Sequence, residues 1–297
     1  MGDAQADGSR GPVVVGVDGS AEAIDAIALG DRLASVLEST VLLTFVHPFE
    51  RAAKKMPSSE YDQLVKEVAN ATLEGLPVEG PGSQPRQMRV IGGSSPGNGL
   101  HSLAAAEQAS ALVVGSSKRG GRGRVTPGGV GEPLLAGSPC PVAVAPRGYA
   151  TEPPPLSPVG VAYDAGSESK MALQWAVTIA EGLEAELRLI AVHSRMAFGN
   201  LSVGGPGQVS SVNAALHDDM RKDLESAAEN IPDLEVTQHL HDGDAASELV
   251  RESAELGLLV TGSRGYGPVR TVLLGSVAND VIRGSKCPVV VVPRGAA

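Results

Sequence analysis

The most constraining feature of this sequence is an internal repeat. Residues 115–148 align with residues 262–295 without a gap, and 15 of the 34 aligned positions are identical. Nearer the N-terminus the offset is one residue shorter, so that Asp18 aligns with Asp164. A repeat of this length means that one folding unit occurs twice, and the fold of either copy predicts the fold of the other.

The repeat predicts two domains, at residues 12–150 and 157–297, each long enough to bury its own core. Residues 151–156 between them form a proline-rich linker, and the segment Thr151–Pro158 holds four prolines. Proline fixes φ and has no amide donor, so we expect this segment to be extended and to stay outside a sheet.

Each copy alternates short apolar runs with helical patterns. Helices are expected at Ala21–Glu38, Ser59–Leu76 and Val277–Arg283, where apolar residues recur with helical spacing. The predicted strands are Val13–Val17, Val41–Val46, Gln87–Ile91, Ala111–Val114, Val142–Ala145, Val159–Tyr163, Leu187–Val192, Val236–Leu240, Leu258–Thr261 and Val289–Val292. Apolar strands that alternate with helices are typical of a parallel sheet covered on both faces. The predicted fold class is α/β, with two tandem doubly wound, Rossmann-like domains.

Composition excludes several classes of function. The formal charge is −10 and aromatic residues make up 3% of the chain, which disfavours nucleic acid as a partner. The polar start lacks the apolar core of a secretion signal, and no segment is apolar enough to span a membrane. With only two cysteines, Cys140 and Cys287, we expect a cytoplasmic protein in which equivalent cysteines pack in each copy without a disulfide.

Candidate ligand contacts follow the predicted strands, because ligands of open parallel sheets bind beyond the carboxyl ends of the strands. In the second copy Asp164 follows the first strand, and Gly262, Gly265, Gly275 and Ser276 follow the fourth with the spacing G-x2-G-x9-G-S. Glycines allow backbone amides to approach phosphate oxygens, and the helix that starts near Ser276 has an anion-binding N-terminus.

These residues, with the valine that precedes His193, resemble the universal stress protein family in its tandem-domain form, over nearly the whole chain. The resemblance implies an adenine-nucleotide alpha-hydrolase-like fold and, in the ATP-binding members, ATP together with Mg²⁺. The aspartate would lie by the adenosine, the strand-two valine by the adenine, and the glycine motif by the ribose and phosphates. The implied ligand residues are Asp164, Val192, Gly262, Gly265, Gly275, Ser276 and Val277.

The first copy departs from this pattern. Its corresponding residues are Asp18, Val46, Gly115, Lys118, Gly128 and Gly129, so Lys118 replaces the second glycine and Gly129 replaces the serine. Lys118, with Arg119, Arg122 and Arg124, is either a phosphate clamp or a solvated, mobile basic loop. We therefore expect the second copy to be the better ATP site.

Other polar residues have simpler interpretations. Asp18 and Asp164 are also suited to cap the following helices, and His47 and His193 to make structural hydrogen bonds. The run from His239 to Asp244 has two histidines on one strand face, but the first copy has Arg89 and Ile91 in the comparable region. We expect no metal site there, because a usable one needs more convergent ligands.

The sequence predicts a regulatory ATP-binding stress-response protein that is not an enzyme. There is no GxxxxGK[ST] phosphate-binding loop and no recognisable catalytic base, although slow ATP hydrolysis stays open. An adenylate-forming enzyme would need a further substrate site that the sequence does not show. The alternative is a nucleotide-independent scaffold that binds an unidentified protein partner through the loops Pro48–Ser58 and Arg195–Ser211. The resemblance also implies pseudo-two-fold pairing of the two domains through their last strands within one chain, and leaves a homodimer open.

Overall fold

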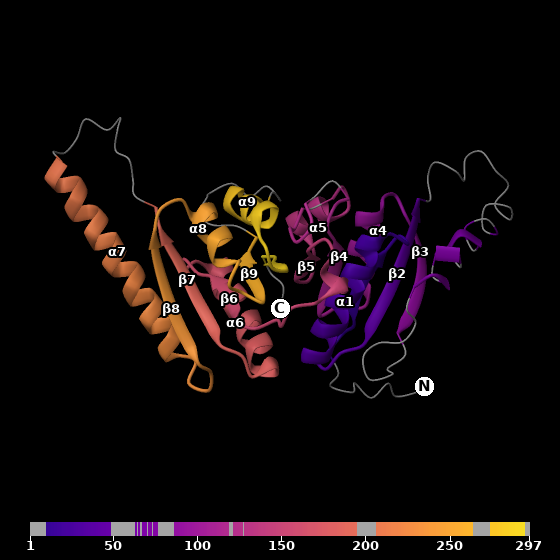
Figure 1. Ribbon diagram of the computed structural model, residues 1–297, viewed down its shortest axis with the longest axis horizontal. Helices are drawn as coiled ribbons and strands as arrows, with labels where there is room; N and C mark the ends of the chain where they lie inside the picture. Colours follow the sequence, from indigo (N-terminus) through magenta and orange to yellow (C-terminus); the bar gives the residue numbers. More distant parts are fainter. Residues whose placement is uncertain are drawn as a thin grey trace. The chain divides into compact units, whose positions relative to one another are not determined.

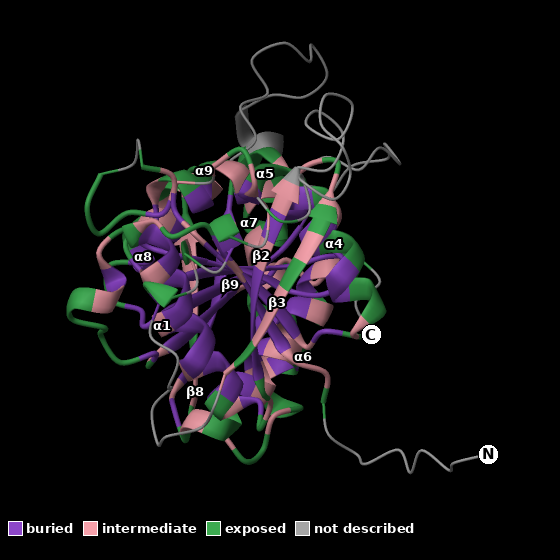
Figure 2. Ribbon diagram, turned by 90° about the vertical axis from the view of Figure 1, so that its right-hand side faces the viewer, coloured by how far each residue is buried: buried purple, intermediate pink, exposed green. Residues whose placement is uncertain are grey.

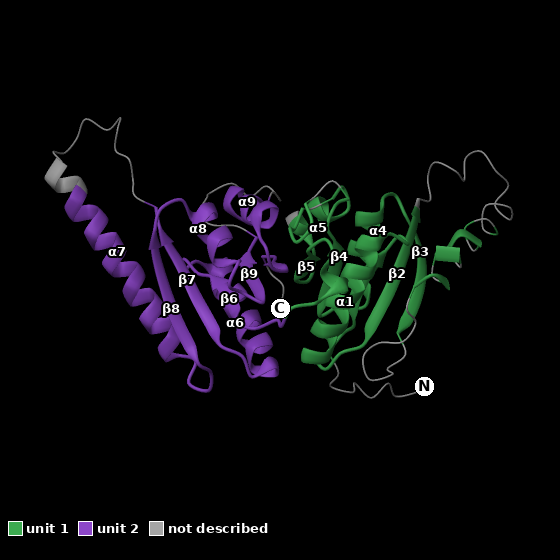
Figure 3. Cartoon of the chain, viewed as in Figure 1, with its two compact units in different colours: residues 1–154, 295–297 green, residues 155–294 purple. Residues whose placement is uncertain are grey.

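The computed structural model describes residues 10–48, 86–118, 121–126, 128–194, 206–263 and 274–294, with residues 63, 65, 67–69, 71, 72 and 74–76. The chain divides into two compact units, shown in different colours in Figure 3. Unit 1 comprises residues 1–154 and 295–297, and unit 2 comprises residues 155–294.

Unit 1 contains a parallel sheet with the strand order β3-β2-β1-β4-β5 (Figure 1). The chain order starts in the middle of the sheet, moves outward through β2 and β3, and returns to the other side of β1. The point where the direction reverses lies between β1 and β4. The strands are β1 (Val13–Val17), β2 (Val41–Pro48), β3 (Gln87–Gly93), β4 (Ala111–Gly115) and β5 (Val142–Ala145).

Unit 2 repeats this topology, with the order β8-β7-β6-β9-β10 and parallel pairing throughout. Its strands are β6 (Val159–Ala162), β7 (Leu187–His193), β8 (Val236–Asp242), β9 (Leu258–Gly262) and β10 (Val289–Val292). The predicted strands and the doubly wound α/β class are therefore confirmed in both copies.

The helices begin where the sequence supplies caps or small residues. Ser20 caps α1 by accepting a hydrogen bond from the Ala23 amide at 3.3 Å, and Ser95 caps α4 in the same way from Asn98 at 3.2 Å. The helices are α1 (Ala21–Val36), α4 (Pro96–Ala106), α5 (Gly131–Gly137), α6 (Ser167–Leu183), α7 (Pro206–Glu229), α8 (Ala245–Glu252) and α9 (Ser276–Gly284). A 3-10 turn spans Tyr149–Thr151. In the predicted helix Ser59–Leu76, residues 63, 65, 67–69, 71, 72 and 74 are helical, and Ser59 lies outside the described residues.

Helices cover both faces of the unit 1 sheet. A Cβ placed on Gly30 of α1 would lie 2.5 Å from Val15, whereas a Cβ on Gly16 would lie 2.8 Å from Leu100 of α4. Because successive strand residues point to opposite faces, α1 and α4 must pack on opposite sides of β1. The central strands are accordingly buried, whereas the edge strand β3 has only exposed and half-buried positions (Figure 2).

The predicted loop Arg195–Ser211 is wrong at its C-terminal end. Helix α7 already begins at Pro206, so residues 206–211 are helical. Proline is compatible with the first turn of a helix, where its missing amide would have had no partner. Residues 195–205 of this loop, and 49–58 of the loop Pro48–Ser58, lie outside the described residues, while Pro48 belongs to β2.

The two cysteines are buried and free, as the sequence predicts. Burial raises the pKa of the Cys140 thiol to about 11 and that of the Cys287 thiol to about 12. Both thiols are therefore neutral and unreactive at physiological pH, which fits a packing role at equivalent places in the two copies.

Candidate functional site

A cavity of about 540 Å³ opens in unit 2 at the carboxyl ends of β6, β7 and β9. These strands meet at the point where the sheet reverses direction, the usual ligand position in this architecture. The cavity brings together four residues that the sequence predicts as ligand contacts: Asp164, Val192, Gly262 and Val277. Gly275 and Ser276 directly precede Val277, and Gly265 lies outside the described residues.

Asp164 builds the turn that leads into α6. Its carboxylate accepts a hydrogen bond from the Gly166 amide at 3.0 Å, while its own amide donates to Ser169 Oγ at 3.3 Å. Asp18 in unit 1 accepts from the Ser20 amide at 3.0 Å in the same manner. Each aspartate thus has a structural role in its turn, and each also lines the cavity of its unit.

The glycines that end β4 and β9 are required by helix packing. A Cβ on Gly262 would lie 2.9 Å from Glu168 Cβ and 3.0 Å from its carbonyl carbon, in the first turn of α6. A Cβ on Gly115 would collide with the carbonyl oxygen of Glu22 in α1. Real Cβ atoms do not approach other atoms this closely, so close contact with a helix gives both glycines a reason independent of any phosphate.

The N-terminus of α9 faces this cavity through Val277 and Ala278. Its N-cap residue, Gly275, has no side chain to accept hydrogen bonds from the first helical turn. The amides there and the positive end of the helix dipole favour an anion. This arrangement is consistent with the predicted phosphate role of Gly275, Ser276 and Val277.

Unit 1 has a smaller cavity, of about 250 Å³, at the corresponding ends of its strands. Its lining includes all six residues that the sequence predicts for this copy: Asp18, Val46, Gly115, Lys118, Gly128 and Gly129. The lining of this cavity among the described residues includes Lys118 but neither Arg122 nor Arg124.

The basic loop of unit 1 is held to the end of β5 over its described part. The Gly123 amide donates to the Arg147 carbonyl at 2.9 Å, and the Arg147 amide donates to the Arg124 carbonyl at 3.2 Å. Ser116 Oγ donates to the Ala145 carbonyl at 2.8 Å. Residues 121–126 are therefore ordered by backbone contacts, and Arg119 lies outside the described residues.

Sequence analysis missed the acidic wall of the unit 2 cavity. Asp219 and Asp223 line the cavity from α7, one helical turn apart, and Tyr163 lines it from the end of β6. Burial, followed by the charges of Asp223 and Asp164, raises the pKa of the Tyr163 hydroxyl, which therefore stays protonated as a donor. The i, i+4 spacing of the two α7 aspartates is visible in the sequence, but the helix itself was not predicted.

His193 forms the structural hydrogen bond expected of it. Its Nδ1 lies 2.8 Å from Asp242 Oδ1, and its ring packs edge-on against His217. Its Nε2 is buried and makes no hydrogen bond. His193 also lines the unit 2 cavity, with Asp242 fixing the orientation of its ring.

The polar side chains of residues 239–244 do not form a single cluster, because they have different partners. Asp242 pairs with His193, and Asp244 caps α8 by accepting from the Ser247 amide at 2.9 Å. Hydrogen bonds from the amide and hydroxyl of Ser247 lower the pKa of Asp244. In the strand register His239 pairs with Ile190, and Arg89 with Thr44, which supports the comparison between His239 and Arg89.

The family model described as the universal stress protein family matches this chain twice, at residues 10–146 and 156–293. The chain therefore belongs to the universal stress protein family and is a tandem two-domain member. Universal stress protein Rv2005c of Mycobacterium tuberculosis H37Rv is 31% identical over 291 residues, covering 94% of this chain and 96% of the relative. A universal stress protein of Mycolicibacterium smegmatis is 26% identical over 300 residues, with the same coverage.

A solved structure has the same fold. The crystal structure of a universal stress protein from Archaeoglobus fulgidus DSM 4304 covers 96% of this chain and 98% of its own, with a TM-score of 0.62 and 23% identity. Among the described residues, none of the helices is both long and apolar enough to cross a membrane.

Proposed function

We propose that this protein is a cytoplasmic ATP-binding regulator of the stress response and that unit 2 holds the nucleotide. The observation that carries the proposal is the 540 Å³ cavity, which joins Asp164, Val192 and Gly262 with the start of α9. Family membership supports the role in the stress response. Adenine nucleotide is the ligand class that suits the two chemically different ends of this cavity.

The phosphates would lie at the end formed by Gly262 and α9. There, Val277 and Ala278 of the first helical turn line the cavity, and no side chain caps the start of this helix. The carboxylates of Asp164, Asp219 and Asp223 line other parts of the wall. Carboxylates accept hydrogen bonds from hydroxyl and amino groups, so these three suit the ribose and adenine, and Mg²⁺ would offset their repulsion of the phosphates.

We propose binding without rapid turnover. The histidine at the cavity, His193, is held by Asp242 on one nitrogen and is buried on the other. A general base must come within hydrogen-bond reach of the water or hydroxyl that it activates. The burial of His193 Nε2 supports this proposal, in which occupancy by ATP, and the partners that occupancy favours, would carry the function.

Calorimetric titration of ATP with Mg²⁺ into the full chain tests this proposal. Val277 lines the unit 2 cavity and is 39% exposed, and its counterpart Val130 lines the unit 1 cavity. Val277→Glu places a carboxylate where phosphates are expected, at a helix start that tolerates acidic residues. We expect one site per chain, weakened about a hundredfold by Val277→Glu because like charges would be juxtaposed. Val130→Glu is the matched control and should bind as the parent does.

The alternative is a scaffold that needs no nucleotide. Val212 and Leu216 lie one turn apart on α7 and are 46% and 39% exposed, and Leu216 also lines the unit 2 cavity, so a partner could contact both at the mouth of this cavity. The absence of both heat and thermal stabilisation by ATP, with the protein folded and free of nucleotide, would overturn the ATP proposal. The scaffold would then be the better account.

A further inference from the structure

We propose that His239, His241 and Glu252 form a binding site for a divalent transition-metal ion, with Zn²⁺ the best-suited ion. The three residues lie in unit 2, with both histidines on strand β8 and Glu252 at the end of α8. None of the three lines the unit 2 cavity, so this site is separate from the proposed nucleotide site.

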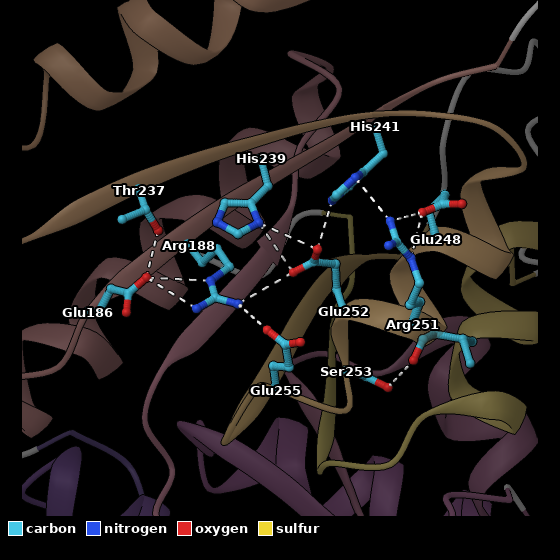
Figure 4. Close-up of polar contacts among 11 residues, drawn as sticks. Glu186, Arg188, Thr237, His239, His241, Glu248, Arg251, Glu252, Ser253 and Glu255 are labelled. Carbon is cyan, nitrogen blue, oxygen red and sulfur yellow. Dashed lines mark hydrogen bonds and ion pairs between the residues drawn. The ribbon is translucent and has the colours of Figure 1, made fainter.

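The three side chains converge on one point, as Figure 4 shows. One ligand atom from each lies within 4.8 Å of the others. His241 Nε2 is 2.8 Å from Glu252 Oε1, and His239 Nδ1 is 3.4 Å from Glu252 Oε2. Tetrahedral zinc with bonds of about 2.1 Å separates its ligand atoms by about 3.4 Å, so the two rings must rotate to complete the geometry.

One nitrogen of the cluster, His241 Nε2, is buried without a hydrogen bond, which suits an atom that binds a metal ion. His241 Nε2 is buried and makes no hydrogen bond, although it lies 2.8 Å from a carboxylate oxygen. The two atoms are therefore close without being aligned toward each other. Two ligand atoms of one metal ion have this relation, because each directs a lone pair at the ion once Nε2 has given up its proton.

Two arginines contact the cluster in the metal-free structure. Arg188 Nη1 is 3.5 Å from Glu252 Oε2 and helps to hold this carboxylate, which has a side chain only 10% exposed. Arg251 lies 3.2 Å from His241 Nδ1. Arginine only donates, so His241 Nδ1 accepts and Nε2 carries the proton in this state. Metal binding at Nε2 displaces that proton to Nδ1, and Arg251, whose side chain is 64% exposed, must move away.

In unit 1, the place that corresponds to the proposed metal site is occupied by an arginine side chain. There, Arg89 of β3 forms an ion pair with Glu107, next to α4, and Ile91 stands where unit 2 has His241. Unit 2 thus has two imidazole side chains, which can bind a metal ion, in place of a guanidinium and an isoleucine. Imidazole nitrogens with one carboxylate favour zinc over magnesium or calcium, which prefer oxygen ligands.

The cluster supplies three protein ligands and leaves a fourth position for water. The carboxylate of Glu252 faces both imidazoles, 3.4 Å from His239 Nδ1 and 2.8 Å from His241 Nε2, so one of its oxygens can bind an ion held between the rings. Glu186, Glu248 and Glu255 keep the surroundings negative by pairing with the two arginines (Figure 4).

Titration of Zn²⁺ and Co²⁺ into the metal-free full chain, without nucleotide, tests the site. We expect one ion per chain and a visible Co²⁺ spectrum of tetrahedral type. His239→Gln and His241→Gln should each weaken binding at least about tenfold, the loss that even an outer-shell substitution typically causes. Arg251→Ala should tighten Zn²⁺ binding, because it removes the group that competes for the tautomer of His241.

The matched control is His101→Gln, which changes an exposed histidine on α4 of unit 1 and should leave Zn²⁺ binding unchanged. His239 keeps 30% of its side chain exposed, so His239→Gln is expected to fold even if His241→Gln does not. Zn²⁺ binding that survives both histidine substitutions would overturn the proposal. Failure of the folded parent to bind Zn²⁺ or Co²⁺ would overturn it equally.

Discussion

The two copies share one fold but differ at the ends of their strands. In unit 1 the cavity is about 250 Å³ and includes Lys118, whereas in unit 2 it is about 540 Å³ and includes Asp219 and Asp223 from α7. A glycine ends the fourth strand in both copies, and in both it closely approaches the helix that follows the first strand. The comparison teaches that the two copies keep a glycine that packing requires, while other residues that line their cavities differ.

The largest expected effect concerns the packing glycine in unit 1. Gly115→Ala forces a Cβ against a backbone oxygen, and we expect a loss of stability of about 3 kcal/mol in unit 1. Gly262→Ala meets atoms at 2.9 and 3.0 Å and should cost unit 2 about 1 kcal/mol.

The single tryptophan, Trp175 in α6, makes this comparison measurable. During urea unfolding, its fluorescence reports unit 2, whereas circular dichroism reports both units. Gly115→Ala should therefore lower the midpoint seen by circular dichroism more than the midpoint seen by fluorescence. If Gly262→Ala is the more damaging substitution, the packing account of these glycines is wrong.

The next prediction concerns a variant in which the first copy regains the glycine motif of the second. Lys118→Gly with Gly129→Ser restores the glycine and serine that unit 2 has, and a Cβ at Gly129 has nothing within 4 Å. We expect the double variant to gain a second ATP site, at least about tenfold tighter than any residual binding to unit 1, which corresponds to about 1.4 kcal/mol.

Calorimetric titration of ATP into the double variant that also carries Val277→Glu measures this second site separately, because the unit 2 site is weakened. A fall in ATP binding on removal of Lys118 would instead show that the lysine acts as a phosphate clamp. The clamp interpretation of the unit 1 loop would then replace our ranking of the two copies.

The smallest expected effect is a loss of stability at alkaline pH, which should be similar in the two copies. Both thiols have a raised pKa, so stability is fully present below the thiol pKa of the unfolded chain and falls as the pH rises toward the folded value. At about pH 9.5 each thiol should cost about 1 kcal/mol of stability relative to neutral pH.

Urea unfolding at neutral and alkaline pH, with Cys140→Ala and Cys287→Ala, checks this expectation. Each substitution should reduce the alkaline loss, independently of any constant cost of the smaller side chain. An unchanged pH dependence in either variant would show that the thiol of that copy is not held neutral by burial.

The fold was predictable because apolar runs and a repeat reinforce each other. The runs Val13–Val17 and Val159–Tyr163 are buried on both faces, so their composition alone marks central parallel strands. Because parallel strands place their carboxyl ends together, Asp164 and His193 could also be assigned to one end of the sheet, and the family resemblance added Val192.

The parts that were not predictable depend on how helices pack. Asp219 and Asp223 reach the cavity only because α7 lies on β7 and β8, and its largely polar sequence gave little sign of this. Glu252 meets His239 and His241 from a helix that begins after β8, so no local spacing links the three residues. Pairing of the two units through their last strands stays a prediction.

Hydrogen–deuterium exchange of the full chain, with and without ATP and Mg²⁺, tests the central claim most directly, because both copies are observed in one molecule. We predict that ATP protects the amides of residues 275–279, at the start of α9, and leaves those of residues 128–132, at the start of α5, unchanged. Protection at α5 alone, or at neither helix, would contradict the assignment of the nucleotide to unit 2.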